Sequence, residues 1–474
     1  MRSIPVAAAV SAGLAALLAG CAVGPSYHAP RTAAEGEFDG RALVAPAAGG
    51  VNTRWWRLFN DPLLEQLVDR ALIANQGLAA ADARLREARA ARRSQFFDFL
   101  PVITGSASGS SERQSAGGTP GGFPVTRGYD LYDAGFDARW ELDVFGRTRR
   151  LNQAARADSD AALAARQGVQ LSVIAEVARN YFELRGAQEQ LAVARRNAGN
   201  QSSALDLVRA RETAGRGTAL DTARAEAQVA ITLASVPPLE ATVSRAMHRI
   251  EVLSGRAPGS LAAQLLADAP QPALPESIAF GNAAELLRRR PDIRVAERQL
   301  AASTARAGVA VADLFPRVTL SAALGLRALS FDALGDAGND RRSAGASLSW
   351  GLFDIGHLSQ QLKVADARSK AQLADYQQTV LLALEETENA LSDFGRERRR
   401  LAYLEQAARA SAQAAQLATQ RFEGGVSDFL TALDAYRSEL DAEDQLAASR
   451  TKAATQLVAL FKALGGGWEP DATP

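Results

Sequence analysis

The sequence predicts a membrane protein of the α+β class, built from two copies of one unit that contains helices and two strands. Three observations support this fold class. Residues recur in order at a constant spacing, which is typical of an internal repeat. Four segments of about ten residues alternate between apolar and polar side chains, as the strands of a transmembrane barrel do. Two very long segments contain no proline and have the seven-residue spacing of coiled-coil helices.

The repeat is visible in individual residues. Five residues of the first copy return 215 positions later: Asp98, Pro101, Thr104, Ser106 and Ala107 recur as Asp313, Pro316, Thr319, Ser321 and Ala322. Six more return 210 positions later: Trp140, Leu142, Gly146, Arg211, Gly215 and Leu220 recur as Trp350, Leu352, Gly356, Arg421, Gly425 and Leu430. Chance would not keep these matches in order at constant spacing. The loop between the two strands is therefore shorter in the second copy.

The composition excludes several classes of function. The 53 basic and 53 acidic residues balance, which argues against a nucleic-acid-binding surface. The three histidines, His28, His248 and His357, are not within helical reach of one another, so they form no metal site. No set of histidine, cysteine or paired acidic residues converges. We therefore expect no catalytic residue, no metal and no cofactor, and the chain is not predicted to be an enzyme.

The N-terminus predicts export and a lipid anchor. Residues 1–20 form a short apolar segment that is typical of a secretory signal peptide. The sequence Leu-Ala-Gly directly before Cys21 resembles the lipobox of bacterial lipoproteins, in which the cysteine becomes the lipidated first residue; the alternative is an ordinary signal peptide with an incidental cysteine. Ala22, rather than aspartate, resembles lipoproteins sorted to the outer membrane. After residue 20 no run of about 18 apolar residues follows, so only strands could cross a membrane.

The mature chain divides into an N-terminal segment, two repeats and a tail. We expect a lipidated extended segment at 21–60, repeat 1 at 61–255, a linker at 256–275, repeat 2 at 276–465 and a C-terminal tail at 466–474.

Each repeat opens with a helix that is interrupted. Asp61 is a plausible N-cap, and Pro62 follows it at the first helical position, where a missing N–H does no harm. Asn75-Gln76-Gly77 breaks this helix, and helical patterning resumes up to Phe97. Arg290-Pro291-Asp292 marks the corresponding break in the second copy.

Four strands are predicted, at about 101–111, 131–143, 316–328 and 343–353. Their apolar and polar faces alternate, which fits a barrel with apolar residues outside and polar residues in the lumen. A soluble sheet with one buried face would alternate equally well. Four strands are too few to close a barrel, so a barrel requires several copies of the chain.

A long helical hairpin follows each strand pair. The segment from Arg147 to about Ala214 would extend about 100 Å as one helix, although a long helix inside a globular fold is the alternative. Glycines predict tight reversals at 214–218 and 424–427, with Thr218 and Ser427 as possible caps of the returning helices. The first returning helix is expected to break at Pro237-Pro238. The second is expected to run from about Asp428 to Leu464.

Seven motifs occur in the order typical of one family, the outer-membrane efflux proteins of the TolC type, and the chain resembles in particular the lipoprotein channels of resistance-nodulation-division efflux systems. The motifs are Cys21-Ala-Val-Gly-Pro-Ser-Tyr27, Trp55-Trp56, Trp140-Glu-Leu-Asp-Val-Phe-Gly146, Arg289-Arg-Pro-Asp-Ile-Arg294, Leu352-Phe-Asp-Ile-Gly356, Arg421-Phe-Glu-Gly-Gly425 and Gly465-Gly-Gly-Trp468. The resemblance covers essentially the whole mature chain.

The resemblance implies a homotrimer in the bacterial outer membrane, anchored by lipid and in contact with outer-membrane lipid. Three protomers of four strands would close a 12-stranded β-barrel, continued into the periplasm by an α-helical coiled-coil barrel. A periplasmic adaptor protein would bind at the hairpin tips, and an inner-membrane resistance-nodulation-division pump would supply the energy. The implied adaptor-contact residues are Gly215, Arg216, Gly217, Thr218, Gly425, Val426 and Ser427.

The resemblance also places a periplasmic gate just after the second tip. Leu430 matches the position that closes the pore by apolar contact, and Asp434 and Arg437 match the charged positions that latch neighbouring helices. Some family members carry a second acidic residue where this chain has Thr431, so an acidic ring would be thinner here. Without the resemblance, Asp434 and Arg437 would be interpreted as an ordinary solvated pair.

The expected function is passive conduction of drug-like or toxic small molecules to the exterior. A duct for metal-ion efflux or for type I protein secretion is the alternative within the same fold. An adaptor protein is a second class, but it would contain one helical hairpin between soluble β domains rather than two hairpins and four alternating strands.

Overall fold

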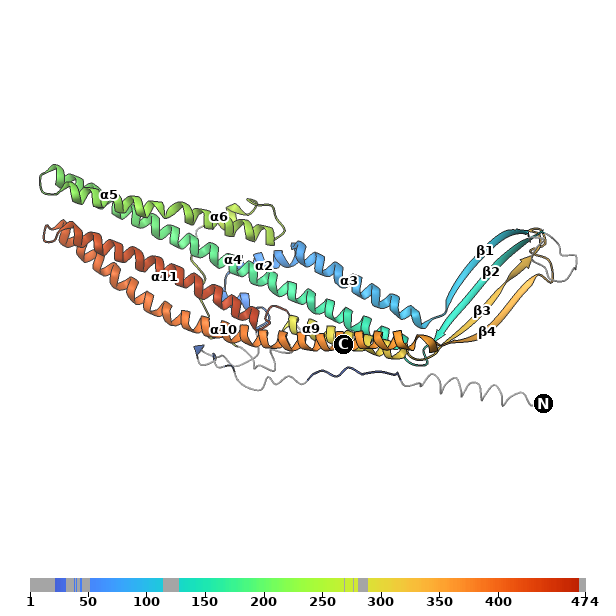
Figure 1. Ribbon diagram of the computed structural model, residues 1–474. Helices are drawn as coiled ribbons and strands as arrows, with labels where there is room; N and C mark the ends of the chain where they lie inside the picture. The colour runs from blue at the N-terminus through green and yellow to red at the C-terminus, as the bar shows by residue number, and fades with distance from the viewer. Residues whose placement is uncertain are drawn as a thin grey trace. The chain divides into compact units, whose positions relative to one another are not determined.

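A computed structural model describes residues 22–30, 38, 40, 43–44, 52–113, 128–267, 269–275, 277–279 and 289–468. The predicted signal peptide, Cys21 and the end of the predicted tail lie outside these residues. Figure 1 shows the elements in chain order. The helices are α2 (Pro62–Ala74), α3 (Gln76–Phe96), α4 (Arg147–Thr213), α5 (Ala219–Ala234), α6 (Val236–Leu253), α7 (Ala262–Leu265), α9 (Pro291–Ala312), α10 (Ile355–Glu423) and α11 (Phe429–Ala463), and the strands are β1 (Val102–Arg113), β2 (Gly128–Leu142), β3 (Arg317–Ala328) and β4 (Asp340–Ser349).

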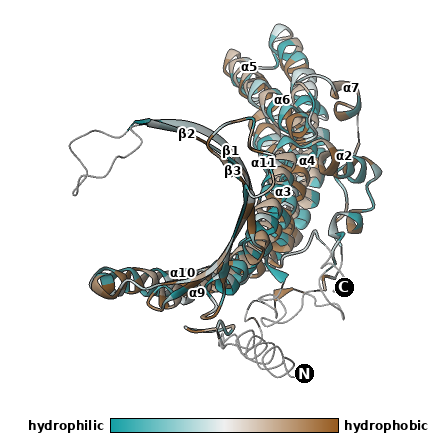
Figure 2. Cartoon of the chain, turned by 90° about the vertical axis from the view of Figure 1, so that its right-hand side faces the viewer, coloured by the Kyte–Doolittle hydropathy of each residue, from teal (hydrophilic) through white to brown (hydrophobic). Residues whose placement is uncertain are grey.

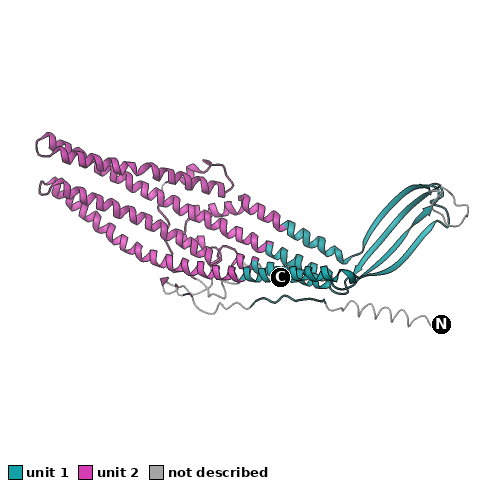
Figure 3. Ribbon diagram, viewed as in Figure 1, with its two compact units in different colours: residues 1–30, 86–161, 296–376 teal, residues 31–85, 162–295, 377–474 magenta. Residues whose placement is uncertain are grey.

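The chain divides into two compact units, coloured separately in Figure 3. Unit 1 lies within residues 1–30, 86–161 and 296–376, and it contains the strands. Unit 2 lies within 31–85, 162–295 and 377–474, and it contains the hairpin tips. The long helices α4 and α10 contribute residues to both units.

The sheet of unit 1 is an antiparallel meander in the order β1-β2-β3-β4. The two repeats join at its centre, where Phe136 of β2 lies opposite Leu324 of β3. Both side chains are exposed in the single chain, as are Ile103 and Leu348 on the outer strands. A sheet with apolar side chains facing outwards and unpaired strands at both edges needs lipid and further strands to be stable.

Equivalent tryptophans tie each strand pair to its helices. The indole Nε1 of Trp140 donates to the backbone oxygen of Phe99 at 3.0 Å, and that of Trp350 donates to the oxygen of Leu314 at 3.1 Å. The predicted repeat is therefore also a structural repeat. The strand β4 ends at Ser349 rather than at the predicted residue 353, because Gly351 turns the backbone and Leu352–Asp354 form a 3₁₀ turn.

The N-terminal segment of unit 1 packs on α4. The Val23 N–H donates to the oxygen of Phe145, and the Arg150 guanidinium donates to the oxygens of Val23 and Gly24. A Cβ on Gly24 would approach Gly308 of α9 within 2.8 Å, so glycine permits this close contact. Residue 22 is thereby held beside Gly146, at the start of α4.

Three of the sequence motifs meet in the core of unit 2. The Trp55 ring stacks on Phe461 with centroids 5.0 Å apart, and its Nε1 donates to the oxygen of Gly466 at 3.3 Å. The buried Arg290 donates to the oxygen of Ala463, and Arg294 lies over the Trp468 ring. The double-tryptophan, arginine and C-terminal glycine motifs therefore pack together in one part of the core.

The two long helices contain 67 and 69 residues, so each extends about 100 Å. Figure 2 shows hydrophilic and hydrophobic residues interleaved along the helices, as expected where they pack side by side. The returning helix of repeat 1 breaks at Ser235, between α5 and α6, and not at Pro237-Pro238 as predicted. Both prolines lie in the first turn of α6, where the backbone N–H groups have no helical partner to lose.

Within the described ranges, no helix combines the length and the apolar character needed to span a lipid bilayer.

Candidate functional site

The tip of repeat 1 reverses the chain through a left-handed glycine. Gly215 has a φ of 70°, and its N–H donates to the oxygen of Glu212 at 2.8 Å. The Arg216 N–H donates to the oxygen of Arg211 at 2.8 Å, which completes a Schellman-type ending of α4. Thr218 caps α5, since its hydroxyl accepts from the N–H of Asp221. Arg216 is exposed, whereas Gly217 is half-buried against the end of α4.

The tip of repeat 2 repeats this geometry. Gly425 has a φ of 73°, its N–H donates to the oxygen of Phe422, and the Val426 N–H donates to the oxygen of Arg421 at 2.9 Å. Val426 presents an exposed apolar side chain at the turn.

The predicted cap Ser427 is wrong. Asp428 caps α11, because its carboxylate accepts from both the N–H and the hydroxyl of Thr431, at 3.0 and 2.6 Å. These hydrogen bonds, the hydroxyl bond first, lower the pKa of the exposed Asp428 carboxyl below its ordinary value. The Ser427 hydroxyl finds no hydrogen-bond partner among the described residues.

The two tips are joined by one arginine. Arg211 donates to the oxygens of Phe422 and Glu423, at 2.7 and 3.0 Å, and its guanidinium lies 4.1 Å from the centroid of the Phe422 ring. It therefore satisfies the carbonyl group of Glu423 at the C-terminus of α10 and adds a second donor to the carbonyl of Phe422, which already accepts from the Gly425 N–H. Beneath this contact a small apolar cluster includes Leu205, Val208, Ala225, Phe422, Phe429, Ala432 and Leu433.

The predicted gate residues lie on α11, directly after the second tip. Leu430 is 40% exposed and Asp434 is exposed, so both are available to another chain. Arg437 donates through Nε to Oε1 of Gln228 on α5 at 2.7 Å. The structure therefore fastens Arg437 to the first hairpin and does not pair it with Asp434 within the chain.

An acidic side chain follows the gate residues on α11. Glu439 lines a groove beside α4 and α10 near the tips. Burial raises the pKa of its carboxyl, the charge of Glu443 adds to the shift, and Arg196 opposes it.

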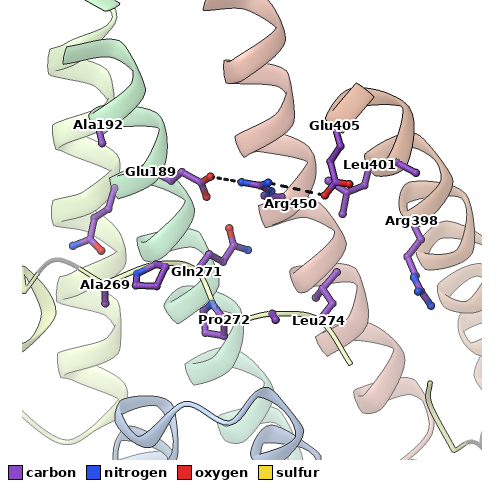
Figure 4. A pocket seen from close by; sticks show the side chains of 14 residues that line it. Glu189, Ala192, Ala269, Gln271, Pro272, Leu274, Arg398, Leu401, Glu405 and Arg450 are labelled. Carbon is purple, nitrogen blue, oxygen red and sulfur yellow. Dashed lines mark hydrogen bonds and ion pairs between the residues drawn. The ribbon is translucent and has the colours of Figure 1, made fainter. Parts of the chain in front are cut away.

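A cavity of unit 2 lies away from the tips, where residues 269–274 cross the long helices (Figure 4). It encloses about 820 Å³. Arg450 of α11 spans it, at 2.8 Å from Glu189 of α4 and 4.0 Å from Glu405 of α10. Arg450 thereby links three helices by ion pairs.

Within the described residues, no three histidine, cysteine, aspartate or glutamate side chains lie close enough together to hold a metal ion. Cys21, the predicted lipidation site, lies outside the part of the chain that the structure describes.

The model of the family described as outer membrane efflux protein matches residues 67–256 and 282–466. The chain belongs to this family. It is 32% identical over 464 residues to the outer membrane protein OprJ of Pseudomonas aeruginosa, with 97% of this chain and 96% of OprJ covered. It is also 32% identical to the pyoverdine export outer membrane protein OpmQ of the same species, over 461 residues that cover 96% of each.

Solved structures confirm the fold class. The outer-membrane channel OprN is 44% identical and superimposes with a TM-score of 0.90, covering 95% of this chain and all of OprN. The predicted fold, a protomer that supplies four strands to a trimeric barrel and long helices to its periplasmic extension, is therefore correct. The chain is an outer-membrane protein with a periplasmic helical extension.

Two contributors to the tips were missed by sequence reasoning. Asp428 occupies the position that corresponds to Thr218 at the 210-residue spacing, so the repeat itself indicated the cap. Arg211 was recognised as a repeated residue, but a single sequence could not reveal that its side chain reaches the other hairpin.

Proposed function

We propose that this chain is the trimeric outer-membrane duct of a tripartite efflux system. It passively conducts drug-like or toxic small molecules that a resistance-nodulation-division pump and a periplasmic adaptor deliver, and it catalyses no reaction and uses no cofactor. The observation that carries this proposal is the combination of an open four-stranded sheet and two long hairpins in a chain that matches outer-membrane efflux proteins over nearly its whole length.

The unequal arginines of the two tips support assembly into a ring. Arg211 holds the end of α10, whereas its repeat equivalent Arg421 makes no hydrogen bond or ion pair through its side chain in the described part of the chain. In a ring of alternating hairpins, Arg421 would meet the carbonyls of Glu212 and Thr213 on the next protomer, the equivalents of those that Arg211 binds. The carboxylate of that Glu212 would stand where Phe422 stands within the chain.

The tips and the gate have separate roles in the proposed duct. Gly215, Arg216, Gly217, Thr218, Gly425, Val426 and Ser427 form the surface that contacts the adaptor. Three copies of Leu430 close the pore around the axis. Asp434 pairs across the protomer boundary with the Arg437 of a neighbour, which must first leave Gln228. In this proposal Arg437 binds either Gln228 within its own chain or Asp434 of a neighbouring protomer.

Cys21 carries the lipid anchor in this proposal. Ala22 lies beside Gly146, four residues after the end of β2, so an acyl chain on Cys21 would enter the membrane next to the barrel. Mass spectrometry of the mature protein should find a lipidated Cys21 at the N-terminus. An unmodified terminus upstream or downstream of Cys21 would contradict this assignment.

The function is tested by planar-bilayer recordings and by efflux in cells. The purified full chain should sediment as a trimer and give discrete conductance steps without added nucleotide. Its deletion should sensitise cells to toluene-like solvents or to large antibiotics. Copper and zinc tolerance and the secretion of proteins are the control measurements. If the deletion changed metal tolerance or protein secretion and left the sensitivity to solvents and antibiotics unchanged, the chain would be a metal or protein duct instead.

A further inference from the structure

We propose that a groove between α3 and α4 binds the phosphate of an anionic phospholipid in the periplasmic leaflet of the outer membrane. Arg89, Arg92, Arg93, Arg149 and Arg156 line this groove, which encloses about 720 Å³ in unit 1. The inference uses the outer-membrane location of the chain and does not depend on which molecules pass through the duct.

The spacing of the lining residues makes the groove a single surface. Arg89, Arg92, Arg93 and Phe96 follow one another at i, i+3, i+4 and i+7 on α3, and Arg149, Asn152, Gln153 and Arg156 do the same on α4. Such positions share one face of a helix. The Nδ2 of Asn152 donates to the oxygen of Gln95 at 3.0 Å, which fixes the two faces against each other.

The positive charge of the groove is not balanced by the described chain. Arg149 is paired with Asp143, 3.0 Å away. Arg89, Arg92, Arg93 and Arg156 make no hydrogen bond or ion pair through their side chains with any described residue, and the groove lining contains no carboxylate. Like charges one helical turn apart repel each other. An anion in the groove would remove this repulsion, and arginine binds phosphate through two parallel N–H donors.

The end of the groove next to the sheet lies at the depth of lipid headgroups. The helix α3 ends at Phe96, just before β1, and α4 begins at Arg147, just after β2. At 1.5 Å per residue, Arg93 and Arg149 lie within about 5 Å of these helix ends, inside the polar layer of a bilayer. Phe96 and Phe99 border the groove, and Phe97 is 62% exposed beside them. Exposed aromatic residues of this kind form the interfacial girdles of membrane barrels.

The N-terminal segment identifies the face that is turned towards lipid. Ser26 and Tyr27 lie in a second pocket on α4, and that pocket shares Gln153 and Arg156 with the arginine groove. Both pockets therefore open on the face of α4 that carries the segment directly following Cys21. A lipid anchored there and a phospholipid in the groove would lie side by side in the same leaflet.

Native mass spectrometry of the purified full-length channel in detergent tests the proposal. The triple variant Arg89→Gln/Arg92→Gln/Arg93→Gln should bind phosphatidylglycerol at least about tenfold more weakly than the parent chain. The matched control Arg396→Gln/Arg399→Gln/Arg409→Gln removes the same charge from exposed positions of α10 and should bind like the parent chain. Replacing the three groove arginines by lysine should weaken binding several-fold, because lysine keeps the charge and loses the bidentate geometry.

Three results would overturn the proposal. The glutamine variant could bind phosphatidylglycerol as tightly as the parent while keeping the parent's oligomeric mass and helix content. Both triple variants could lose lipid equally, which would indicate a general effect of charge. Inorganic phosphate at matched concentration could displace the lipid completely, in which case the groove binds a free anion and not a headgroup.

Discussion

The two hairpin tips have the same backbone and different side-chain partners. Gly215 and Gly425 have φ values of 70° and 73°, and each N–H donates to the carbonyl three residues before it. A neutral hydroxyl caps the helix after the first tip, and a carboxylate caps the helix after the second. The two repeats therefore share the backbone conformation of the turn and differ in the side chains that cap the following helix.

The equivalent arginines of the two tips, Arg211 and Arg421, also differ in their contacts. The side chain of Arg211 joins the two hairpins within the chain. Arg421 is exposed and makes no side-chain hydrogen bond or ion pair with a described residue. Leu430 and its repeat equivalent Leu220 are both exposed. Only Leu430, on the second hairpin, is followed by an aspartate four residues later and an arginine seven residues later. We expect the second tip to face the pore and the next protomer, and the first tip to support it.

The largest effect is expected from filling the second turn. Gly425→Ala requires a positive φ that costs about 1–2 kcal/mol in an L-residue, although its Cβ would meet no described atom within 4 Å. Gly425→Trp adds bulk at the adaptor surface and should abolish crosslinking to the adaptor and efflux. Gly425→Ala separates strain from bulk and should retain most activity. If Gly425→Trp crosslinked and exported like the parent, the tip would not be the adaptor surface.

The next effect is on conductance. Leu430→Ala removes the apolar seal and Asp434→Ala removes one partner of the latch. Either change should raise the open population several-fold to about a hundredfold, since 1.4 kcal/mol corresponds to tenfold, and the single-channel conductance in planar bilayers should rise. Leu220→Ala, at the equivalent position of the first hairpin, should leave conductance unchanged, and so should Leu324→Ala on β3. Equal conductance in all four variants, with the trimer intact, would place the gate elsewhere.

A smaller effect concerns the junction between protomers. Exposed arginine contacts contribute only about 0–1 kcal/mol, so proximity is a better measurement than stability. A short bismaleimide should link Thr213→Cys/Arg421→Cys chains into dimers and trimers on denaturing gels. The matched pair Arg211→Cys/Glu423→Cys should crosslink within one chain and leave the monomer band. If both cysteine variants sedimented as trimers but gave only a monomer band, Arg421 would not contact the next protomer. The proposed function would be unaffected by that result.

The smallest effect is a pH dependence of the second tip alone. Hydrogen bonds from Thr431 lower the pKa of Asp428, so its cap stabilises the folded tip above the ordinary pKa of about 4. This stabilisation disappears as the pH falls through the lowered pKa. Hydrogen-exchange protection at the start of α11 should therefore decrease below about pH 4. Protection at the start of α5 should decrease less, because the capping hydroxyl of Thr218 does not ionise, although it also donates to the carboxylate of Asp221. Asp428→Asn should remove the pH dependence of protection at the start of α11. If the variant and the parent had the same pH profile, the Asp428 cap would not cause this dependence.

The helical part of the fold was predictable because its signals are local. Asp61 and Pro62 mark the start of α2, and the proline-free stretch from Arg147 predicted α4 nearly to its last residue. The errors were also local. Pro237 was interpreted as a break although a helix tolerates proline in its first turn, and Ser427 was chosen over the neighbouring Asp428.

The site was less predictable, because its contacts join segments that are distant in sequence. Arg211 reaches Phe422 only because two hairpins lie side by side, and no periodicity encodes that. The arginine groove was different, since Arg89, Arg92, Arg93 and Phe96 have helical spacing that is visible in the sequence. The gate depends on three chains around one axis, so it stays a prediction.

The strand register has a consequence for the order of folding. The β1–β2 and β3–β4 pairs each join strands that are close in sequence, but β2 pairs with β3 across the entire first helical hairpin. Closing a long loop is entropically costly and slow. Each strand pair can form as soon as it has been exported, whereas the central pairing must wait until α4, α5 and α6 have passed through the inner membrane. Until β3 and β4 follow, the nascent chain carries a single β1–β2 ribbon with two open edges, and a periplasmic chaperone that covers such edges would act in this interval.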